Sequence, residues 1–240
     1  MSVTGPELSV LLPAFNEAES LPEVWSELGA VLDALGRPAE VIFVDDGSVD
    51  ATPEIVRAMR TKDPRVRLLR LAANRGLSAA LDAGFERARG RIIVTMDSDL
   101  QNDPRDIPRM LAALEGYDAV TGWRQERDDP WLKRASSRIA NAVRNAITQE
   151  HVRDSACTLR VIRRGCLPGL PRFRGFHRFV PTLLRLAGCR VLELPVSHRA
   201  RRFGVSHYGI RNRAVVAFED LLAVRWMQER WLRYDASEEP

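Results

Sequence analysis

Short apolar runs alternate with longer amphipathic segments four times within about the first hundred residues. The runs lie at residues 8–13, 40–44, 66–71 and 92–94, and the segments between them place apolar side chains on one face of a helix. This alternation predicts an α/β fold, with a mainly parallel sheet that is covered by helices on both faces. The glycine patterns of a dinucleotide-binding turn and of a phosphate-binding P-loop are both missing, so these two classes are excluded.

The second half of the chain is organised differently. The predicted elements are a strand at 117–122, a charged loop at 123–134, a helix at 135–147, a polar turn and strand at 154–162, a loop of aromatic and basic residues at 170–178, a helix at 179–186 and a strand at 191–197. Pro195 cannot donate a hydrogen bond to a neighbouring strand, so we expect the last strand at the edge of the sheet.

A final amphipathic helix is predicted over residues 211–233. Its apolar face is formed by Val215, Phe218, Leu221, Leu222 and Trp226. Such a helix can lie on a membrane surface, dock on a partner or cover the core of its own domain. The sequence leaves these three roles open.

The composition is that of one globular α/β domain. The chain has 240 residues, of which 45% are hydrophobic and 28% are charged. We expect neither a signal segment nor a membrane-spanning helix, because no run approaches the roughly 18 consecutive apolar residues that a span needs. The three cysteines are too few and too irregularly spaced for a disulfide framework or a zinc site. We therefore expect reduced thiols in a cytoplasmic protein.

The two halves of the chain differ in charge. Residues 1–120 hold 13 Lys and Arg against 20 Asp and Glu, a net charge of −7, whereas residues 121–240 hold 23 against 12, a net charge of +11. The acidic half is suited to a cation, and the basic half to phosphate groups, an anionic membrane face or nucleic acid.

Polar residues directly follow three of the predicted strands. They are found at residues 15–17, 45–48 and 97–99. Right-handed crossovers place the carboxyl ends of parallel strands at one edge of the sheet, where open α/β sheets bind their ligands. We therefore expect the three acidic segments to meet there.

The last of these segments predicts a metal site. Asp97, Asp99 and Gln101 alternate along the chain, so an extended backbone would point all three to the same side. Two carboxylates and an amide oxygen suit a hard divalent cation that also takes phosphate oxygens. The alternative is a pair of solvated turn aspartates without a ligand.

Seven motifs, in order along nearly the whole chain, together resemble those of a known family. They are residues 11–17 (LLPAFNE), 44–50 (VDDGSVD), 74–76 (NRG), 97–101 (DSDLQ), 154–160 (DSACTLR), 174–176 (RGF) and 201–206 (RRFGVS). The chain resembles the inverting glycosyltransferases of family 2, which have the Rossmann-like GT-A fold. Within this family it is similar to the polyprenol-phosphate glycosyltransferases, such as dolichol-phosphate mannosyltransferase.

The resemblance implies a single glycosyltransferase domain. Its nucleotide-sugar half would span about 1–122, its acceptor half about 123–208 and its amphipathic helix about 209–235. The implied reaction moves a hexose, with mannose favoured and glucose next, from GDP-mannose or UDP-glucose to a polyprenyl phosphate at the cytoplasmic membrane face. Mg²⁺ or Mn²⁺ would bridge the donor diphosphate and assist its departure as a Lewis acid.

The resemblance also implies residue roles. The donor would be bound by Pro13, Phe15, Glu17, Val44, Asp46, Asp97, Ser98, Asp99, Gln101, Arg178, Arg201 and Arg202. The metal ligands would be Asp97, Asp99 and Gln101, the acceptor phosphate would contact Arg124, Arg127 and Arg134, and the catalytic residues would be Asp99 and Asp154. An acceptor phosphate is ionised near neutral pH, so it needs no general base. Asp154 is then either a catalytic or orienting group or the cap of its own turn.

Two features depart from the family pattern. His207 stands where the family commonly has a lysine that binds phosphate, which weakens the positive charge at neutral pH. Many bacterial relatives continue into membrane helices, whereas this sequence ends at Pro240. We therefore expect it to reach the membrane through its basic face, its last helix or a separate membrane-anchoring protein.

Two other functions remain as alternatives. A glycosyltransferase that acts on a polysaccharide or protein hydroxyl would need a base such as Asp154. A basic module for nucleic acid would use the aromatic and basic side chains of residues 172–178, and it leaves the acidic strand ends unexplained. We therefore expect no nucleic-acid partner.

Overall fold

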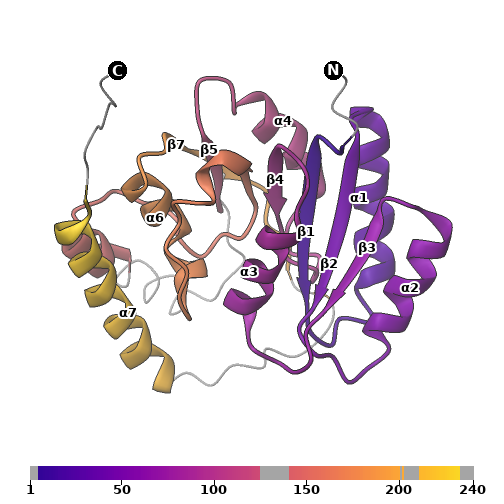
Figure 1. Cartoon of the computed structure of the whole chain (residues 1–240), viewed down its shortest axis with the longest axis horizontal. Helices are drawn as coiled ribbons and strands as arrows, with labels where there is room; N and C mark the ends of the chain where they lie inside the picture. Colours follow the sequence, from indigo (N-terminus) through magenta and orange to yellow (C-terminus); the bar gives the residue numbers. More distant parts are fainter. Residues whose placement is uncertain (1–4, 125–140, 201, 203–210, 233–240) are drawn as a thin grey trace, which may run out of the picture.

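A computed structural model describes residues 5–124, 141–200, 202 and 211–232 (Figure 1). Its strands are β1 (Leu8–Ala14), β2 (Ala39–Asp45), β3 (Val66–Arg70), β4 (Ile92–Thr95), β5 (Ala119–Arg124), β6 (Arg160–Arg163) and β7 (Val191–Val196). They form one seven-stranded sheet in the order β3-β2-β1-β4-β6-β5-β7. Strand β6 runs antiparallel to both of its neighbours, and the other pairs are parallel, so the sheet is mainly parallel as predicted.

Helices cover both faces of the sheet. They are α1 (Leu21–Leu35), α2 (Thr52–Lys62), α3 (Leu77–Arg87), α4 (Ile107–Ala112), α6 (Val180–Leu186) and α7 (Arg211–Arg230), with single 3₁₀ turns η1 (Pro104–Asp106), η2 (Arg164–Cys166) and η3 (Phe176–Arg178). Residues 141–148 are also helical. Among the described helices, none combines the length and hydropathy needed to cross a membrane.

Alternation along the strands builds two hydrophobic cores. On β2, Val41 and Phe43 belong to the core that also contains residues of α1, α2 and α4, whereas Ile42 and Val44 belong to the core that contains residues of α3, α6 and α7. Successive side chains of a strand point to opposite faces, so a strand buried on both faces must be apolar throughout. The continuous apolar runs of the sequence are therefore explained by burial on both sides.

Strand β6 is antiparallel because of where the chain enters the sheet. Strand β5 ends at the carboxyl edge, and β6 begins at that same edge, where Arg160 lies opposite Thr95 of β4 and Thr121 of β5. The polar turn predicted before this strand is confirmed, because Asp154 Oδ1 accepts the amide N–H of Ala156 at 3.1 Å and the strand begins at Arg160.

The edge position of β7 is confirmed, and Pro195 lies opposite Trp123 at the border of the sheet. Helix α7 differs from the prediction of a single apolar face. Leu221 and Val224 are buried against the core, whereas Phe218, Leu222 and Trp226 are 47–59% exposed. The helix therefore covers the core of its own domain and also presents a separate apolar stripe to the outside.

Candidate active site at the carboxyl edge of the sheet

The three acidic segments meet at the carboxyl edge, as predicted. Between the loops after β1 and β2, the amide of Asn16 donates to Ser48 Oγ at 2.9 Å. Between the loops after β1 and β4, Ser98 Oγ donates to the Pro13 carbonyl, and Ser20 Oγ donates to the Ser98 carbonyl, both at 2.7 Å. These bonds join distant parts of the sequence into one rim, which includes two of the predicted donor-binding residues.

The Asp97–Gln101 segment is a turn and not an extended strand. Strand β4 ends at Thr95, Leu100 has a positive φ of 65°, and Asp99 Oδ1 accepts the amide N–H of Gln101 at 3.1 Å. The expectation that alternation aligns the three side chains is therefore wrong. The side-chain bond of Asp99 to the backbone two residues later bends the chain, which brings the aspartates together by turn geometry.

Asp97 and Asp99 are close enough to affect each other's charge. Burial, together with the negative charge of Asp99, raises the pKa of Asp97 to about 6. Asp97 is oriented by two bonds: Thr158 Oγ1 donates to its Oδ2 at 2.6 Å, and its amide donates to Asn102 Oδ1 at 2.8 Å. Two like charges held this near each other favour a bound cation, which would relieve their repulsion.

A buried arginine lies behind this pair. Arg160 is 2% exposed, and its Nη2 donates to the carbonyls of Ser155 at 3.2 Å and of His177 at 3.1 Å. Its positive charge lowers the pKa of Asp97 and so opposes the effects of burial and Asp99. No role is predicted for Arg160 from the sequence, although it is the last residue of the motif at 154–160. An arginine that opens a buried strand was the available signal.

His198 is a second residue without a predicted role. The Gln101 Nε2 atom lies 3.4 Å from His198 Nε2, and the Gln101 carbonyl accepts the amide of Arg199 at 3.0 Å. The polar segment after the edge strand β7 is the sequence signal for this contact. His198 also forms a bridge with Asn102, which fixes the segment after β7 against the Asp97–Gln101 turn.

The donor set fits a cation shared with a substrate. Among the residues that the structure describes, no group of three His, Cys, Asp or Glu side chains could hold a metal. Mg²⁺ is commonly bound by only one or two carboxylates, with waters and substrate phosphates completing its shell. Asp97 and Asp99 match that arrangement, and Gln101 offers an additional oxygen.

The residues predicted to contact the nucleotide have different surroundings. Both oxygens of Asp46 accept amide N–H groups, from Arg75 at 2.7 Å and Gly76 at 2.8 Å. Val44 has no exposed surface, so its side chain is part of the core and reaches no ligand. Each oxygen of Asp46 keeps a second lone pair, and its contact with a base or ribose stays a prediction.

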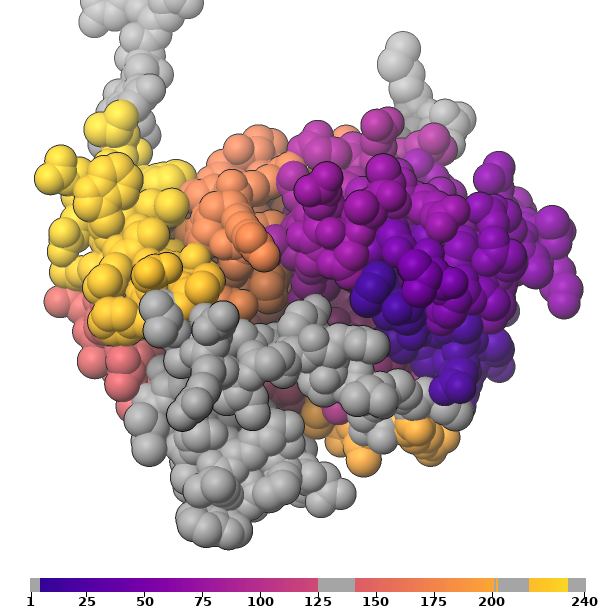
Figure 2. Space-filling view, turned by 90° about the horizontal axis from the view of Figure 1, so that it is seen from below, coloured from indigo at the N-terminus to yellow at the C-terminus, as the bar shows by residue number. Residues whose placement is uncertain are grey.

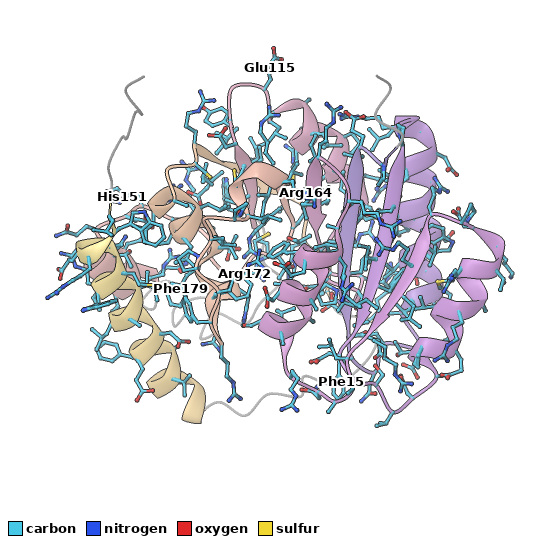
Figure 3. All side chains as sticks on the ribbon, viewed as in Figure 1. Phe15, Glu115, His151, Arg164, Arg172 and Phe179 are labelled. Atoms are coloured by element: carbon cyan, nitrogen blue, oxygen red, sulfur yellow. The ribbon has the colours of Figure 1, made fainter. Side chains whose placement is uncertain are left out.

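Phe15 and Glu17 lie at the carboxyl edge. Figure 3 shows Phe15 at the lower end of the sheet, beyond β1. Glu17 Oε2 accepts the hydroxyl of Ser20 at 2.9 Å, and its amide donates to Thr52 Oγ1 at the same distance. Both residues are half-buried. Their position fits the predicted wall for a nucleotide.

The predicted phosphate-binding arginines are held by carboxylates where the structure describes them. Arg124 makes a bidentate ion pair with Asp154, in which the Nε–Oδ2 distance is 2.7 Å and the Nη2–Oδ1 distance is 3.0 Å. Arg178 Nη1 lies 3.2 Å from Asp220 of α7, and the exposed Arg202 lies 2.8 Å from Glu23. The predicted residues Arg127, Arg134 and Arg201, together with His207, lie outside the described residues.

The aromatic and basic loop gives no support to nucleic-acid binding. Phe176 is 1% exposed and packs on Phe85, so its face is not available to a base. Arg172 is paired with Asp82 and Glu86 of α3. Stacking platforms need accessible aromatic faces.

Comparison with protein families identifies the domain. The model of the family described as glycosyl transferase family 2 matches residues 9–168, which is more than half of the chain. The matched region contains β1–β6 and the turn with Asp97 and Asp99.

Curated relatives extend the similarity further along the chain. Undecaprenyl-phosphate 4-deoxy-4-formamido-L-arabinose transferase of Edwardsiella ictaluri is 37% identical over 205 residues, which cover 85% of this chain and 63% of the relative. The enzymes of the same name from Aeromonas hydrophila and Salmonella gallinarum are each 38% identical, over 205 and 204 residues. The chain thus spans somewhat less than two thirds of the length of these relatives.

Solved structures support the fold. Glucosyl-3-phosphoglycerate synthase from Mycobacterium tuberculosis, crystallised with Mn²⁺, uridine diphosphate and phosphoglyceric acid, superposes with a TM-score of 0.69. The match covers 93% of this chain and 78% of the synthase at 22% identity. A second structure of that synthase, with Mg²⁺ and uridine diphosphate, gives the same TM-score. Since the family model matches most of a domain with this architecture, the chain belongs to glycosyl transferase family 2 and has the GT-A fold.

Proposed function

We propose that the chain transfers a sugar from a nucleotide-activated donor to a polyprenyl phosphate. The observation that carries this proposal is the pair Asp97 and Asp99, whose charges interact at the carboxyl edge of the sheet. In an open α/β sheet this edge is where nucleotide ligands bind. The names of the curated relatives, which act on undecaprenyl phosphate, support a lipid phosphate as the acceptor.

A divalent cation would be held by Asp97 and Asp99, with Gln101 and the donor diphosphate as further ligands. When bound, Mg²⁺ or Mn²⁺ neutralises charge on the departing nucleoside diphosphate. Thr158 and Asn102 orient Asp97 toward this position through the bonds described above. The buried charge of Arg160 favours the ionised form of Asp97, which is the form that binds a metal.

The surroundings of Asp154 support a phosphate acceptor over a hydroxyl acceptor. Both oxygens of its carboxylate accept hydrogen bonds, from the Arg124 guanidinium and from the amide of Ala156, which leaves them poorly placed to receive a proton from an acceptor hydroxyl. A phosphate oxygen is already ionised and can attack the anomeric carbon directly, while the bond from that carbon to the leaving diphosphate breaks. In this proposal Asp154 orients Arg124 toward the acceptor. Asp154→Asn would then retain part of the activity, whereas a general base would leave almost none.

The names of the curated relatives indicate which donor sugar to test. They are named for 4-deoxy-4-formamido-L-arabinose, a pentose derivative, and not for mannose or glucose. An identity of 37–38% supports the reaction class more strongly than the sugar. We propose a nucleotide-activated form of this arabinose derivative as the first donor to test, with GDP-mannose and UDP-glucose tested beside it.

The apolar stripe of α7 would place the enzyme on the membrane. Phe218, Leu222 and Trp226 recur at four-residue spacing on the outer side of α7 and are about half exposed. The Arg230 guanidinium lies 5.9 Å from the centre of the Trp226 ring, an aromatic and cationic combination typical of membrane interfaces. Seen from the carboxyl edge, α7 forms one flank of the molecule (Figure 2). We propose a peripheral position on the cytoplasmic face, with a separate anchoring protein as a further contributor.

A transfer assay with labelled donors and undecaprenyl phosphate in detergent tests the proposal. We expect a labelled lipid product from one donor, only with Mg²⁺ or Mn²⁺. Asp99→Ala should abolish it, whereas the control Asp33→Asn, which removes an exposed aspartate on α1, should not. Failure of every donor, or full activity of Asp99→Ala, would contradict the proposal.

The membrane position needs its own measurement. We expect the protein to float with vesicles in a density gradient and Leu222→Glu to abolish flotation. The matched change Val49→Glu, at an exposed apolar residue outside α7, should leave flotation unchanged. Equal flotation of the three proteins would exclude α7 as the contact without affecting the proposed reaction.

A further inference from the structure

A groove lies apart from the candidate active site, beside the edge strand. Its volume is about 570 Å³, and it is bounded by the helical residues 141–148, residues 151–153, α6 and the start of β7. Figure 3 shows His151, which lines the groove, far from Phe15 at the carboxyl edge. A volume of this size is typical of sites for small organic ligands.

The groove carries more positive than negative charge. Arg153, Arg185 and His151 line it, together with a single carboxylate, Glu193. Glu193 Oε1 accepts the amide of Arg153 at 2.9 Å, and Glu193 Oε2 lies 3.9 Å from Arg185 Nη2. One carboxylate thus faces two guanidinium groups and an imidazole. The lining leaves positive charge uncompensated.

A further arginine lies behind the wall of this groove. Arg144 is 6% exposed, and its Nη2 donates to Asn145 Oδ1 at 2.9 Å and to the Val152 carbonyl at 2.7 Å, both on residues that line the groove. Its Nε and Nη1 atoms have no hydrogen-bond partner among the described residues. Burial lowers the pKa of Arg144, although the negative charges of Glu150, Glu193 and Asp154 oppose this effect.

The nearby carboxylates act on Arg144 through their charge and have hydrogen-bond partners elsewhere. Glu150 Oε2 accepts the hydroxyl of Thr182 at 2.6 Å, and Glu193 is shared as described above. The ion pairs of the described residues do not include Arg144, and a buried cation without a direct ion pair is costly, so a further anion near it would stabilise this part of the fold. The groove is the accessible space next to Arg144 in which such an anion can sit.

We propose that this groove binds a small organic anion, whose phosphate or carboxylate group lies between Arg153 and Arg185. Tyr117, Val191 and Leu192 supply an apolar wall for the body of the molecule. Paired guanidinium groups suit planar or tetrahedral oxyanions because each presents a fork of N–H donors. The site is separate from the proposed donor and acceptor positions and does not depend on the proposed transfer reaction.

Occupancy of the groove would reach the candidate active site through Arg153. Its guanidinium lies 5.1 Å from the ring centre of Trp123, and Trp123 and Arg153 directly precede Arg124 and Asp154 in the sequence. An anion that draws Arg153 toward the groove therefore acts on the segment that carries the Arg124–Asp154 ion pair. The groove is a candidate regulatory site as well as a binding site.

Calorimetric titration with phenyl phosphate tests the inference directly. We expect saturable binding of one molecule per chain, weakened about tenfold in Arg185→Gln and in Arg153→Gln. Arg91→Gln, which removes an exposed arginine paired with Glu7, should bind like the unmodified protein. Asp99→Ala should also bind normally, because the groove is not the active site.

Three results would overturn the inference. One is the absence of saturable binding at millimolar phenyl phosphate. Another is an affinity that falls equally in Arg91→Gln and Arg185→Gln, which would indicate a general effect of charge. The third is binding that Asp99→Ala abolishes and Arg185→Gln leaves intact, which would assign the phosphate to the active site. Because Arg153 is exposed, its variant should fold, and circular dichroism checks this.

Discussion

Asp97 should destabilise the metal-free protein at neutral pH, so replacing it with asparagine should increase stability. Its pKa is 3.8 in an unperturbed setting and about 6 in the folded protein, because burial and the charge of Asp99 disfavour its ionised form. Above pH 6 the carboxyl is ionised in both states, and the folded state carries the whole penalty. Below about pH 4 it is protonated in both states, and the penalty is gone.

The size of the effect follows from the pKa difference. A shift of one pKa unit corresponds to about 1.4 kcal/mol, so the difference of about two units sets a ceiling near 3 kcal/mol. Relaxation around the half-buried side chain reduces this, and we expect Asp97→Asn to raise the free energy of unfolding by about 1 to 3 kcal/mol at pH 8. Asparagine keeps an oxygen that can accept the Thr158 hydroxyl bond.

Urea unfolding in EDTA at pH 8 and pH 4.5 measures this. The stability gained by Asp97→Asn should be largest at pH 8 and shrink as the pH falls. Asp118→Asn is the matched control with the opposite sign, because the amide of Arg190 lowers the pKa of Asp118. That variant should lose stability at pH 8 and lose less at low pH. A gain in Asp97→Asn that does not change with pH, or a loss of stability at pH 8, would refute the reasoning.

Two further predictions concern a glycine in a tight turn and the buried charge of Arg160. Gly47→Ala should lower the free energy of unfolding, measured in urea, by about 1 to 3 kcal/mol. Gly47 has a φ of 76°, and a Cβ at this position would lie 2.6 Å from the backbone of Ala73. An unchanged free energy of unfolding would contradict this prediction. Arg160→Met should weaken the binding of Mn²⁺, measured by calorimetry, because it removes the charge that favours ionised Asp97. The control Arg163→Met changes an exposed arginine and should leave Mn²⁺ affinity unchanged. Equal affinities of the two variants would contradict the role of Arg160.

The parallel part of the fold could be predicted because its signals are local. The apolar runs of β1, β2 and β4 are buried on both faces, β3 forms an edge that is only partly buried, and right-handed crossovers fix where the strands end. The direction of β6 could not be predicted, since it depends on the edge at which the chain returns to the sheet. The apolar face of α7 was predicted as one surface, and packing against the core divides it between Leu221 on the inside and Phe218 on the outside.

The candidate site also combines features that the sequence could predict with features that it could not. The meeting of three acidic segments follows from topology, so the sequence could anticipate it. The sequence marks the positions of Arg160 and His198, but it does not specify their partners, because these contacts join segments that come together only when β6 and β7 take their places. The strand alternation assumed for Asp97 and Gln101 failed because the Asp99 side chain binds the backbone and turns the chain.

The choice of acceptor tests the central proposal most directly. The protein is incubated with Mn²⁺, a panel of nucleotide sugars and either undecaprenyl phosphate or undecaprenol, and sugar-dependent release of nucleoside diphosphate is measured. We predict release with undecaprenyl phosphate and none above background with undecaprenol, because Asp154 is held by Arg124 and, in the proposed reaction, an ionised phosphate needs no base. Equal release with both acceptors, or release with undecaprenol alone, would contradict the proposed function.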